Sequence, residues 1–495
     1  MKHTIRGLSL VFACLCTSLS ALADVRLPKM FSDHAVLQRD VKLIVWGWAD
    51  PGERVTVKIS KRSGQTTADQ DGKWKVALSP LKAGGPFELV VAGKTTNTVK
   101  DILVGDVWIC SGQSNMEFGL GGADNAQAAI QAATNAAIRL LHVTADQLAA
   151  PAADIPNVWE VCSPQTVPGF SAVGYFFGKA IHDQTGVPIG LIESAWGGTA
   201  IEPWTPPESW KQTAELAKRD VPGDLSHIYN GRIAPLAPYG VKGALWYQGE
   251  SNGGDDDIYY HKMSALINGW RQTWGELSEK RAKTGVVPQY DLSFYFVQLA
   301  DFQGPNPNPE GGDGWAKIRM AQFKSLQIPK TGMAVAIDIG AADDIHPRNK
   351  EDVGIRLAQW ALAKDYDKSR IVCSGPLYKG LKVEGDKIRL AFDYVGKGLM
   401  VGRKDGHGPA VEVKDGKLQR FAICGADPAA PAGAAGADRK WVWADAVIDG
   451  KTVLVSSTNV VHPVAVRYGF SMNPEGCNLY NKDGLPASPF RTDNW

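Results

Sequence analysis

The 495-residue sequence has almost no net charge and no strongly basic block. Lys and Arg together number 53 and Asp and Glu 52, which gives a formal net charge of +1. Nucleic-acid-binding proteins concentrate basic residues on one face, so this balance argues against a nucleic-acid partner. After residue 23 no run approaches 18 consecutive apolar residues. We therefore predict no membrane-spanning helix.

The N-terminus is the one strongly apolar stretch. Lys2 precedes an apolar run over residues 8–19, and residues 21–23 read Ala-Leu-Ala, a small-x-small cleavage site. This pattern is typical of a secretory signal peptide, and its apolar run is too short to cross a bilayer. We predict a signal peptide at residues 1–23 and a secreted or periplasmic mature chain that begins at about Asp24.

Metal-binding cysteine spacings are missing after the signal peptide, where no C-x-x-C pair occurs. We therefore predict no metal site, and we expect no cofactor. Cys14 and Cys16 could anchor a lipid, although the residues before each fit a lipid-attachment site poorly. An exported chain can form disulfides. We expect one or two, with the other thiols buried, among five cysteines whose pairing stays open: Cys110, Cys162, Cys373, Cys424 and Cys477.

The chain divides into three segments with different patterns of strand-like and helix-like residues. Residues 24–104 contain short β-rich runs separated by turn residues, which suggests a small β-sandwich domain. Residues 105–365 alternate apolar runs with helix-like stretches, which indicates a parallel sheet covered by helices. Residues 366–495 are β-like again and include a low-complexity loop at 428–437. The pattern predicts an α/β fold with a β domain at each end.

The central segment carries the elements that matter for a site. We predict buried strands at 107–110, 189–192, 243–246 and 333–337, and helices at 126–137, 175–185, 259–274 and 319–326. In open parallel sheets, ligand sites lie at the carboxyl ends of the strands. Polar motifs directly follow three of the predicted strands, so we expect these motifs to meet.

Ser114 is the candidate nucleophile. It lies in the run Gly112-Gln113-Ser114-Asn115-Met116, directly after the predicted strand at 107–110. A serine on a tight strand-to-helix turn exposes its hydroxyl beside helix N-terminal amides, which can stabilise an oxyanion. The alternative is a helix N-cap, a common position for serine.

A general base follows the predicted strand at 333–337, in the run Asp343-Asp344-Ile345-His346-Pro347. Histidine is the usual base for a serine nucleophile, and a carboxylate normally holds its tautomer. Asp343, three residues before His346, is the predicted carboxylate, and the adjacent Asp344 is the alternative. A capping aspartate with a surface histidine would give the same short pattern.

Two further motifs offer oxyanion donors. Trp196-Gly197-Gly198-Thr199 follows the strand at 189–192, and glycines let the backbone approach a ligand closely. Residues 246–252, Trp-Tyr-Gln-Gly-Glu-Ser-Asn, follow the strand at 243–246 and offer two amides and a carboxylate. Either motif alone would fit an ordinary turn.

Aromatic residues crowd these motifs, and aromatic faces suit sugar rings, although a tryptophan beside a strand is more often core. Arg319 would suit a substrate carboxylate or a structural ion pair. The polar loop at 303–314 would contact substrate or serve as a solvent-exposed spacer. The predicted substrate contacts are Asn115, Glu250, Asn252, Trp204, Trp315 and Arg319.

Taken together, the motifs resemble those of the sialate O-acetylesterase family, in the SGNH/GDSL hydrolase superfamily. The resemblance rests on G-Q-S-N-M at 112–116, W-G-G-T at 196–199, W-Y-Q-G-E-S-N at 246–252 and D-x-x-H at 343–346. Residues 27–34 and 45–49 also resemble the family's N-terminal β region, so the likeness spans about residues 27 to 480. It implies a flavodoxin-like α/β/α sandwich with flanking jelly-roll-like β segments.

The resemblance also implies roles for individual residues. Ser114 would be the nucleophile, His346 the base and Asp343 its orienting carboxylate. The oxyanion hole would comprise the Ser114 and Gly197 backbone N–H groups and the Gln248 side chain.

Two positions depart from the pattern of relatives. Many superfamily members place an Asn from a G-x-N-D block in the third oxyanion role. Here the block reads Q-G-E-S-N, so Asn252 is the alternative to Gln248. Arg232 stands where relatives often carry Met.

The resemblance implies a secreted serine esterase that removes acetyl groups from an O-acetylated carbohydrate and needs no cofactor. Its sugar could be sialic acid or a plant polysaccharide such as xylan, xyloglucan or pectin. An inactive carbohydrate-binding protein and a lipid esterase or thioesterase of the same superfamily are the alternatives.

Overall fold

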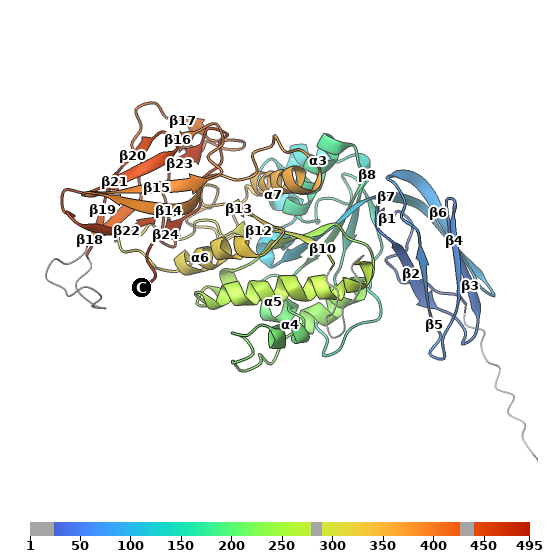
Figure 1. The fold of residues 1–495 in the computed structure, drawn as a ribbon. Helices are drawn as coiled ribbons and strands as arrows, with labels where there is room; N and C mark the ends of the chain where they lie inside the picture. The colour runs from blue at the N-terminus through green and yellow to red at the C-terminus, as the bar shows by residue number, and fades with distance from the viewer. Residues whose placement is uncertain (1–23, 279–289, 426–439) are drawn as a thin grey trace, which may run out of the picture.

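A computed structural model describes residues 24–278, 290–425 and 440–495. The predicted signal peptide and the low-complexity loop at 428–437 lie outside the described residues. The chain forms a central α/β unit with N-terminal strands at one end and C-terminal sheets at the other (Figure 1).

A mostly parallel sheet forms the centre. Its strands lie in the order β13 (Thr331–Val335), β12 (Ser293–Gln298), β11 (Gly243–Tyr247), β7 (Thr96–Gly112), β10 (Ile189–Ala195), β8 (Asn135–His142) and β9 (Glu160–Cys162). Only β9 runs antiparallel to its neighbour within this row. Every residue of β10, β11 and β12 is buried, as expected for a sheet covered on both faces.

Helices cover both faces of this sheet (Figure 1). On one face α3 (Ala172–Thr185) packs against α7 (Lys350–Asp365). On the other, α5 (Ile258–Thr273) contacts both α4 (Pro207–Gln212) and α6 (Ala316–Lys324). The predicted fold class, an α/β/α sandwich with flanking β segments, is confirmed.

One element prediction needs correction. The helix predicted over 126–137 ends early, as α2 (Ala126–Ala132), and strand β8 begins at Asn135. Alanine favours helix, but Ile138 and the leucines after it fill a buried strand paired with β10, and this packing overrides local propensity. Strand β12 and helix α7 were not among the predicted elements.

Strand β7 belongs to two layers at once. Its first part pairs antiparallel with β6 (Gly84–Ala92), and its last part pairs in parallel with β10 and β11. Residue 104, the predicted domain boundary, lies inside this 17-residue strand. The N-terminal layer is therefore a continuation of the central sheet rather than a tethered module.

The remaining N-terminal strands complete that layer. They are β1 (Val36–Gln38), β3 (Arg54–Ile59) and β4 (Arg62–Thr67), with β2 (Leu43–Trp48) and β5 (Lys73–Leu78) as a separate pair. The alternating burial of β3 and β5 shows that one face of each is packed and the other solvated.

The described residues of the C-terminal part, up to 425 and from 440 on, form three antiparallel sheets. One has the order β14 (Leu377–Glu384), β15 (Lys387–Asp393), β21 (Thr452–Ser456), β20 (Asp445–Asp449). Another joins β17 (Val411–Glu412), β16 (Leu399–Arg403) and β23 (Leu479–Asn481). The third joins β19 (Trp441–Trp443), β18 (Phe421–Gly425), β22 (Pro463–Tyr468) and β24 (Phe490–Arg491).

Arg319 joins the C-terminal part to the central unit. Its guanidinium is fully buried and donates hydrogen bonds to four backbone carbonyls, those of Leu299, Ala300, Ser471 and Met472, at 2.6–2.8 Å. Burial lowers the pKa of Arg319 to about 10. Neither predicted role describes this side chain, because its hydrogen-bond acceptors are carbonyls rather than carboxylates.

The loop at 303–314 lies at the same boundary between the central unit and the C-terminal part. Gly312 N–H donates to the Phe470 carbonyl at 2.7 Å, and the Asp313 carboxylate accepts from Met472 N–H at 3.2 Å. The end of the loop is therefore tied to the C-terminal part, while most of its residues are exposed, in part as the spacer interpretation predicts.

The expected disulfides are absent from the described chain. Cys110, Cys162, Cys373 and Cys477 are unbridged thiols, so no two of the five cysteines after residue 23 are joined there. Among the described residues, no helix has the length and apolar character needed to cross a membrane.

We predict that Arg319→Met lowers the free energy of unfolding by at least about 3 kcal/mol, because it strips donors from buried carbonyls. Urea unfolding followed by circular dichroism would measure this. Arg403→Met is the control, since Arg403 and its partner Asp405 are 68% and 58% exposed, and it should cost less than about 1 kcal/mol. Equal losses in the two variants would contradict the prediction.

Candidate active site

The turn that carries Ser114 depends on a glycine. Gly112, the last residue of β7, has φ of 133°, and a Cβ there would lie 2.2 Å from the Tyr247 carbonyl oxygen. Only glycine fits this close approach. Ser114 then opens the short helix α1 (Ser114–Glu117) and is half-buried.

The structure brings Ser114 and His346 together. Ser114 Oγ and His346 Nε2 lie 2.9 Å apart, although 232 residues separate them in the chain. The imidazole also stacks on the ring of Phe118, with centroids 6.4 Å apart and an interplanar angle of 29°. This is the geometry that proton transfer from the hydroxyl to the imidazole requires.

The two candidate carboxylates, Asp343 and Asp344, differ in the contacts that they make with His346. Asp344 Oδ1 accepts the His346 backbone N–H at 2.8 Å and lies 3.9 Å from Nδ1. Asp343 is exposed, and within the described residues its side chain makes no hydrogen bond or ion pair. The predicted Asp343–His346 hydrogen bond is thus not formed in this conformation, and the nearer carboxylate is that of Asp344.

Gly197 lies beside Ser114, but its N–H is already engaged. A Cβ on Gly197 would lie 3.3 Å from Ser114 Cβ. The Gly197 N–H donates to Glu117 Oε2 at 2.7 Å, while the Ser114 N–H has no partner among the described residues. Sequence reasoning missed Glu117, although its place three residues after the nucleophile put it at this turn.

The side chains of Gln248 and Asn252 are buried and fully engaged. Gln248 Nε2 donates to the Thr199 carbonyl at 3.2 Å and to Asn252 Oδ1 at 2.7 Å, and its Oε1 accepts from Tyr259 at 2.6 Å. Asn252 Oδ1 also accepts the Ile201 N–H at 2.9 Å. These amides tie the segment containing Gly197 to the segment after β11.

Four predicted substrate contacts lie in the core instead. Trp204 is fully buried and donates to Thr199 Oγ1 at 3.0 Å, and Trp315 is 8% exposed and stacks on Phe302. Asn115 is 2% and Asn252 5% exposed. The polar groups and ring faces of these four side chains contact other protein groups. The sequence prediction of substrate contact therefore needs correction at these positions and also at the buried Arg319.

A buried carboxyl lies at the same end of the sheet. Glu193 in β10 is fully buried, and its Oε2 accepts the Ser171 N–H at 2.7 Å. Burial raises the pKa of Glu193 to about 8, and the charge of Glu117 adds to the increase. Glu193 is therefore largely protonated at neutral pH.

Arg232 is the cation of this region. It is 7% exposed, donates to the Ala145 and Ala195 carbonyls, and lies over the Trp196 ring at 4.3 Å from its centroid. Burial lowers the pKa of Arg232, and the charge of Glu117 opposes the decrease. Arg232 therefore supports the half-buried Trp196, which precedes Gly197.

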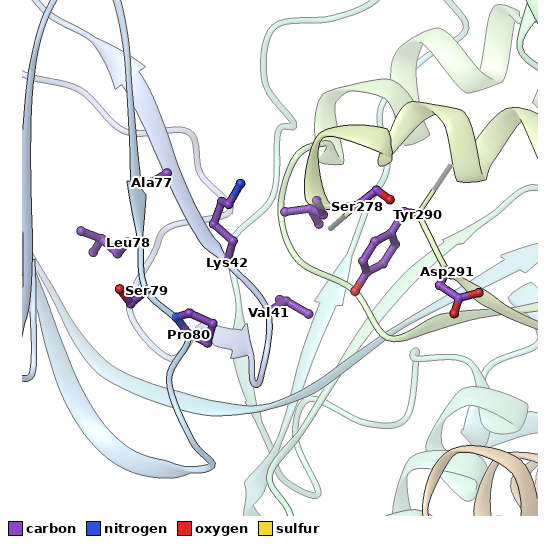
Figure 2. A pocket seen from close by; sticks show the side chains of 10 residues that line it. Val41, Lys42, Ala77, Leu78, Ser79, Pro80, Ser278, Tyr290 and Asp291 are labelled. Carbon is purple, nitrogen blue, oxygen red and sulfur yellow. The ribbon is translucent and has the colours of Figure 1, made fainter. Parts of the chain in front are cut away.

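A hollow of about 610 Å³ lies away from these residues, between the N-terminal strands and the central unit. Lys42 and Pro80 line one side and Tyr290 and Asp291 the other (Figure 2). Neither Ser114 nor His346 lines it. The part of the chain that the structure describes also holds no cluster of three or more His, Cys, Asp or Glu residues suited to a metal ion.

Comparisons with known proteins point to one class of enzyme. The family described as carbohydrate esterase, sialic acid-specific acetylesterase, matches residues 104–363. Sialate O-acetylesterases of Pongo abelii and Homo sapiens are each 31% identical over 522 residues, covering 95% of this chain and 93% of each relative. The crystal structure of a carbohydrate acetylesterase from Xanthomonas citri is similar with a TM-score of 0.82 and 40% identity, covering 95% of this chain and all of that one.

We predict that Glu193→Gln flattens the dependence of stability on pH. The unfolded carboxyl loses its proton near pH 4.5, whereas the folded one keeps it up to about pH 8, so this group's contribution to wild-type stability is lost as pH rises through that window. The wild-type free energy of unfolding should fall by about 3 kcal/mol more between pH 5 and pH 8 than that of Glu193→Gln.

Urea unfolding at the two pH values would measure the difference. A variant of the exposed Glu88, Glu88→Gln, serves as the control and should follow the wild type. Parallel pH curves for wild type and Glu193→Gln would contradict the prediction.

Proposed function

Because the chain belongs to the sialic acid-specific acetylesterase family of carbohydrate esterases, we propose that it is a secreted serine esterase that removes acetyl groups from a carbohydrate. One observation carries the serine mechanism: the 2.9 Å approach of His346 Nε2 to Ser114 Oγ. The signal-peptide pattern of residues 1–23 supports export.

In the first half-reaction, Ser114 Oγ attacks the ester carbonyl carbon while His346 Nε2 accepts the hydroxyl proton. The tetrahedral intermediate collapses, the bond to the sugar oxygen breaks, and His346 returns its proton to that oxygen. The sugar leaves as an alcohol and the acetyl group stays on Ser114. In the second half-reaction His346 deprotonates water, which attacks the acetyl-enzyme and releases acetate.

The proposed oxyanion hole consists of the Ser114 and Gly197 N–H groups and the Gln248 amide. Each such donor is typically worth about 3 kcal/mol of barrier. One N–H cannot serve a carboxylate and an oxyanion together, so Glu117 must release Gly197 when the ester binds. Gln248 Nε2 can donate to the oxyanion only if its long hydrogen bond to the Thr199 carbonyl breaks. Its assignment is therefore the weakest of the three.

We propose Asp343 as the carboxylate that orients His346. Asp344 already accepts a hydrogen bond from the His346 backbone N–H, so its carboxylate stabilises the conformation of this loop. The exposed and unpartnered Asp343 can turn toward Nδ1 without breaking a contact, and catalytic hydrogen bonds often tighten only when substrate binds.

The substrate class follows from the relatives and from the site surface. Trp196, half-buried and backed by Arg232, is an aromatic face beside Gly197 that suits a sugar ring. The mammalian relatives are sialate O-acetylesterases, and the bacterial structure is a carbohydrate acetylesterase. O-acetylated sialic acid and acetylated plant polysaccharide are therefore the two substrates to compare.

Acetate release from O-acetylated sialic acid, acetylated xylan and acetylated xyloglucan tests the proposal. We expect turnover of at least one, and a loss of at least about 10³-fold in both Ser114→Ala and His346→Ala because nucleophile and base act as one unit. Near-normal turnover by folded Ser114→Ala would rule out the serine mechanism. In a series of p-nitrophenyl esters the rate should peak at acetate, and a peak at octanoate would favour a lipid esterase.

The two aspartates can be separated by matched variants. Asp343→Asn should lower kcat by at least about 10²-fold, because a neutral amide stabilises the imidazolium poorly. Asp344→Asn should cost less than about tenfold, since asparagine keeps the oxygen that accepts the His346 N–H. The reverse order of losses in steady-state kinetics would assign the role to Asp344.

A further inference from the structure

Two buried polar side chains and one half-buried carboxylate form a cluster behind the Ser114–His346 pair. Asn115 follows the nucleophile in α1, Lys350 is the first residue of α7, and Glu250 begins the short helix η5 (Glu250–Asn252) after β11. Asn115 and Lys350 are 2% and 1% exposed. We call these three residues the Asn115 cluster.

Neighbours on either side orient the Asn115 amide. Lys350 Nζ donates to Asn115 Oδ1 at 2.5 Å, and Asn115 Nδ2 donates to Glu250 Oε1 at 2.7 Å and to the Ile345 carbonyl. A backbone carbonyl can only accept, so the group that faces Ile345 is the amide nitrogen. The amide therefore has a single orientation, with its nitrogen turned away from Lys350.

That orientation connects the two halves of the active site. The second proton of Asn115 Nδ2 goes to the carbonyl of Ile345 at 3.0 Å. Asn115 is the neighbour of Ser114, and Ile345 is the neighbour of His346. One side-chain hydrogen bond thus joins the peptide next to the nucleophile to the peptide next to the base.

Lys350 occupies a position that disfavours a cation on two counts. It is buried, and it lies in the first turn of a 16-residue helix, whose N-terminus carries partial positive charge. Burial lowers the pKa of Lys350 to about 7, with the charges of Glu250 and Asp344 opposing the decrease. Among the described residues Lys350 makes no ion pair within 4.0 Å, and Asn115 is the acceptor of its ammonium.

We propose that Asn115 and Lys350 are positioning residues that set the distance between Ser114 Oγ and His346 Nε2. Lys350 holds the Asn115 amide, and the amide holds the Ile345 carbonyl. The inference rests on the proposed serine mechanism and adds residues that touch neither the ester nor the reacting atoms. A structural role alone would change stability, whereas a positioning role changes kcat in a folded enzyme.

The test compares Lys350→Met, Asn115→Ala and the double variant on p-nitrophenyl acetate. A displacement of about 1 Å can cost about 10²-fold, so each single variant should lose about 10²-fold in kcat with KM changed less than about threefold. The double variant should lie within about threefold of the slower single variant, because Lys350 acts through Asn115. The rate at which an alkyl fluorophosphonate labels Ser114 should fall in parallel with kcat.

Lys404→Met is the matched control. Lys404 is also a buried lysine against α7, paired with Asp352 at 2.8 Å and 6% exposed, but it has no bond to Asn115. Its kcat should stay within about threefold of wild type. Circular dichroism melting curves report folding of every variant, and if Lys350→Met does not fold, Asn115→Ala carries the same kcat test.

The outcomes separate this inference from the proposed function. Wild-type kcat in folded Lys350→Met or Asn115→Ala, with Ser114→Ala inactive, overturns only the positioning role. An equal loss in Lys404→Met, or losses that multiply in the double variant, also overturns it. Activity in Ser114→Ala overturns the serine mechanism itself.

Discussion

Strand β7 pairs in parallel with β10 on one side and with β11 on the other, and this pairing determines which loops meet. Gly112 lies opposite Ala195 in one register and Tyr247 in the other. The chain leaves all three strands at the same level, so Ser114, Gly197 and Gln248 each follow within two residues of that level. The position of Gly112 against the Tyr247 carbonyl keeps the turn tight enough to present the serine hydroxyl.

Beneath that edge, buried amides link the loops, together with the ion pairs of Lys262 to Glu202 and Asp255. The Gln248–Asn252 pair joins the loop after β10 to the loop after β11, and Asn115 joins the turn after β7 to the histidine loop. An amide offers donors and an acceptor at fixed angles, so it can link carbonyl, carboxylate and ammonium groups in one step. The Gln248 and Asn252 amides donate all of their N–H groups within this network, and such bonding rigidifies the groups it connects.

The family resemblance implied the α/β/α sandwich. Reasoning from sequence patterns predicted a parallel sheet covered by helices and the meeting of Ser114 with His346, because both depend on strand ends that local pattern reveals. It erred where the partner comes from a distant segment. From the sequence Arg319 suits a carboxylate ligand, but backbone carbonyls near residue 471 surround its guanidinium. The sequence position of Lys350 could have marked it as a candidate, because it follows His346 by four residues and begins a helix. The motifs used to predict the site did not include it.

The hydrogen bonds by which Arg319 joins the central unit to the C-terminal part also have a consequence for the order in which the chain is synthesised. The ribosome delivers Arg319 about 150 residues before the carbonyls of Ser471 and Met472 that take half of its hydrogen bonds. Until those residues are made, two of the four acceptors of the Arg319 guanidinium are missing, although helix α6 already has α5 and β12 to pack on. The buried environment of Arg319 is therefore complete only once the last part of the chain is present.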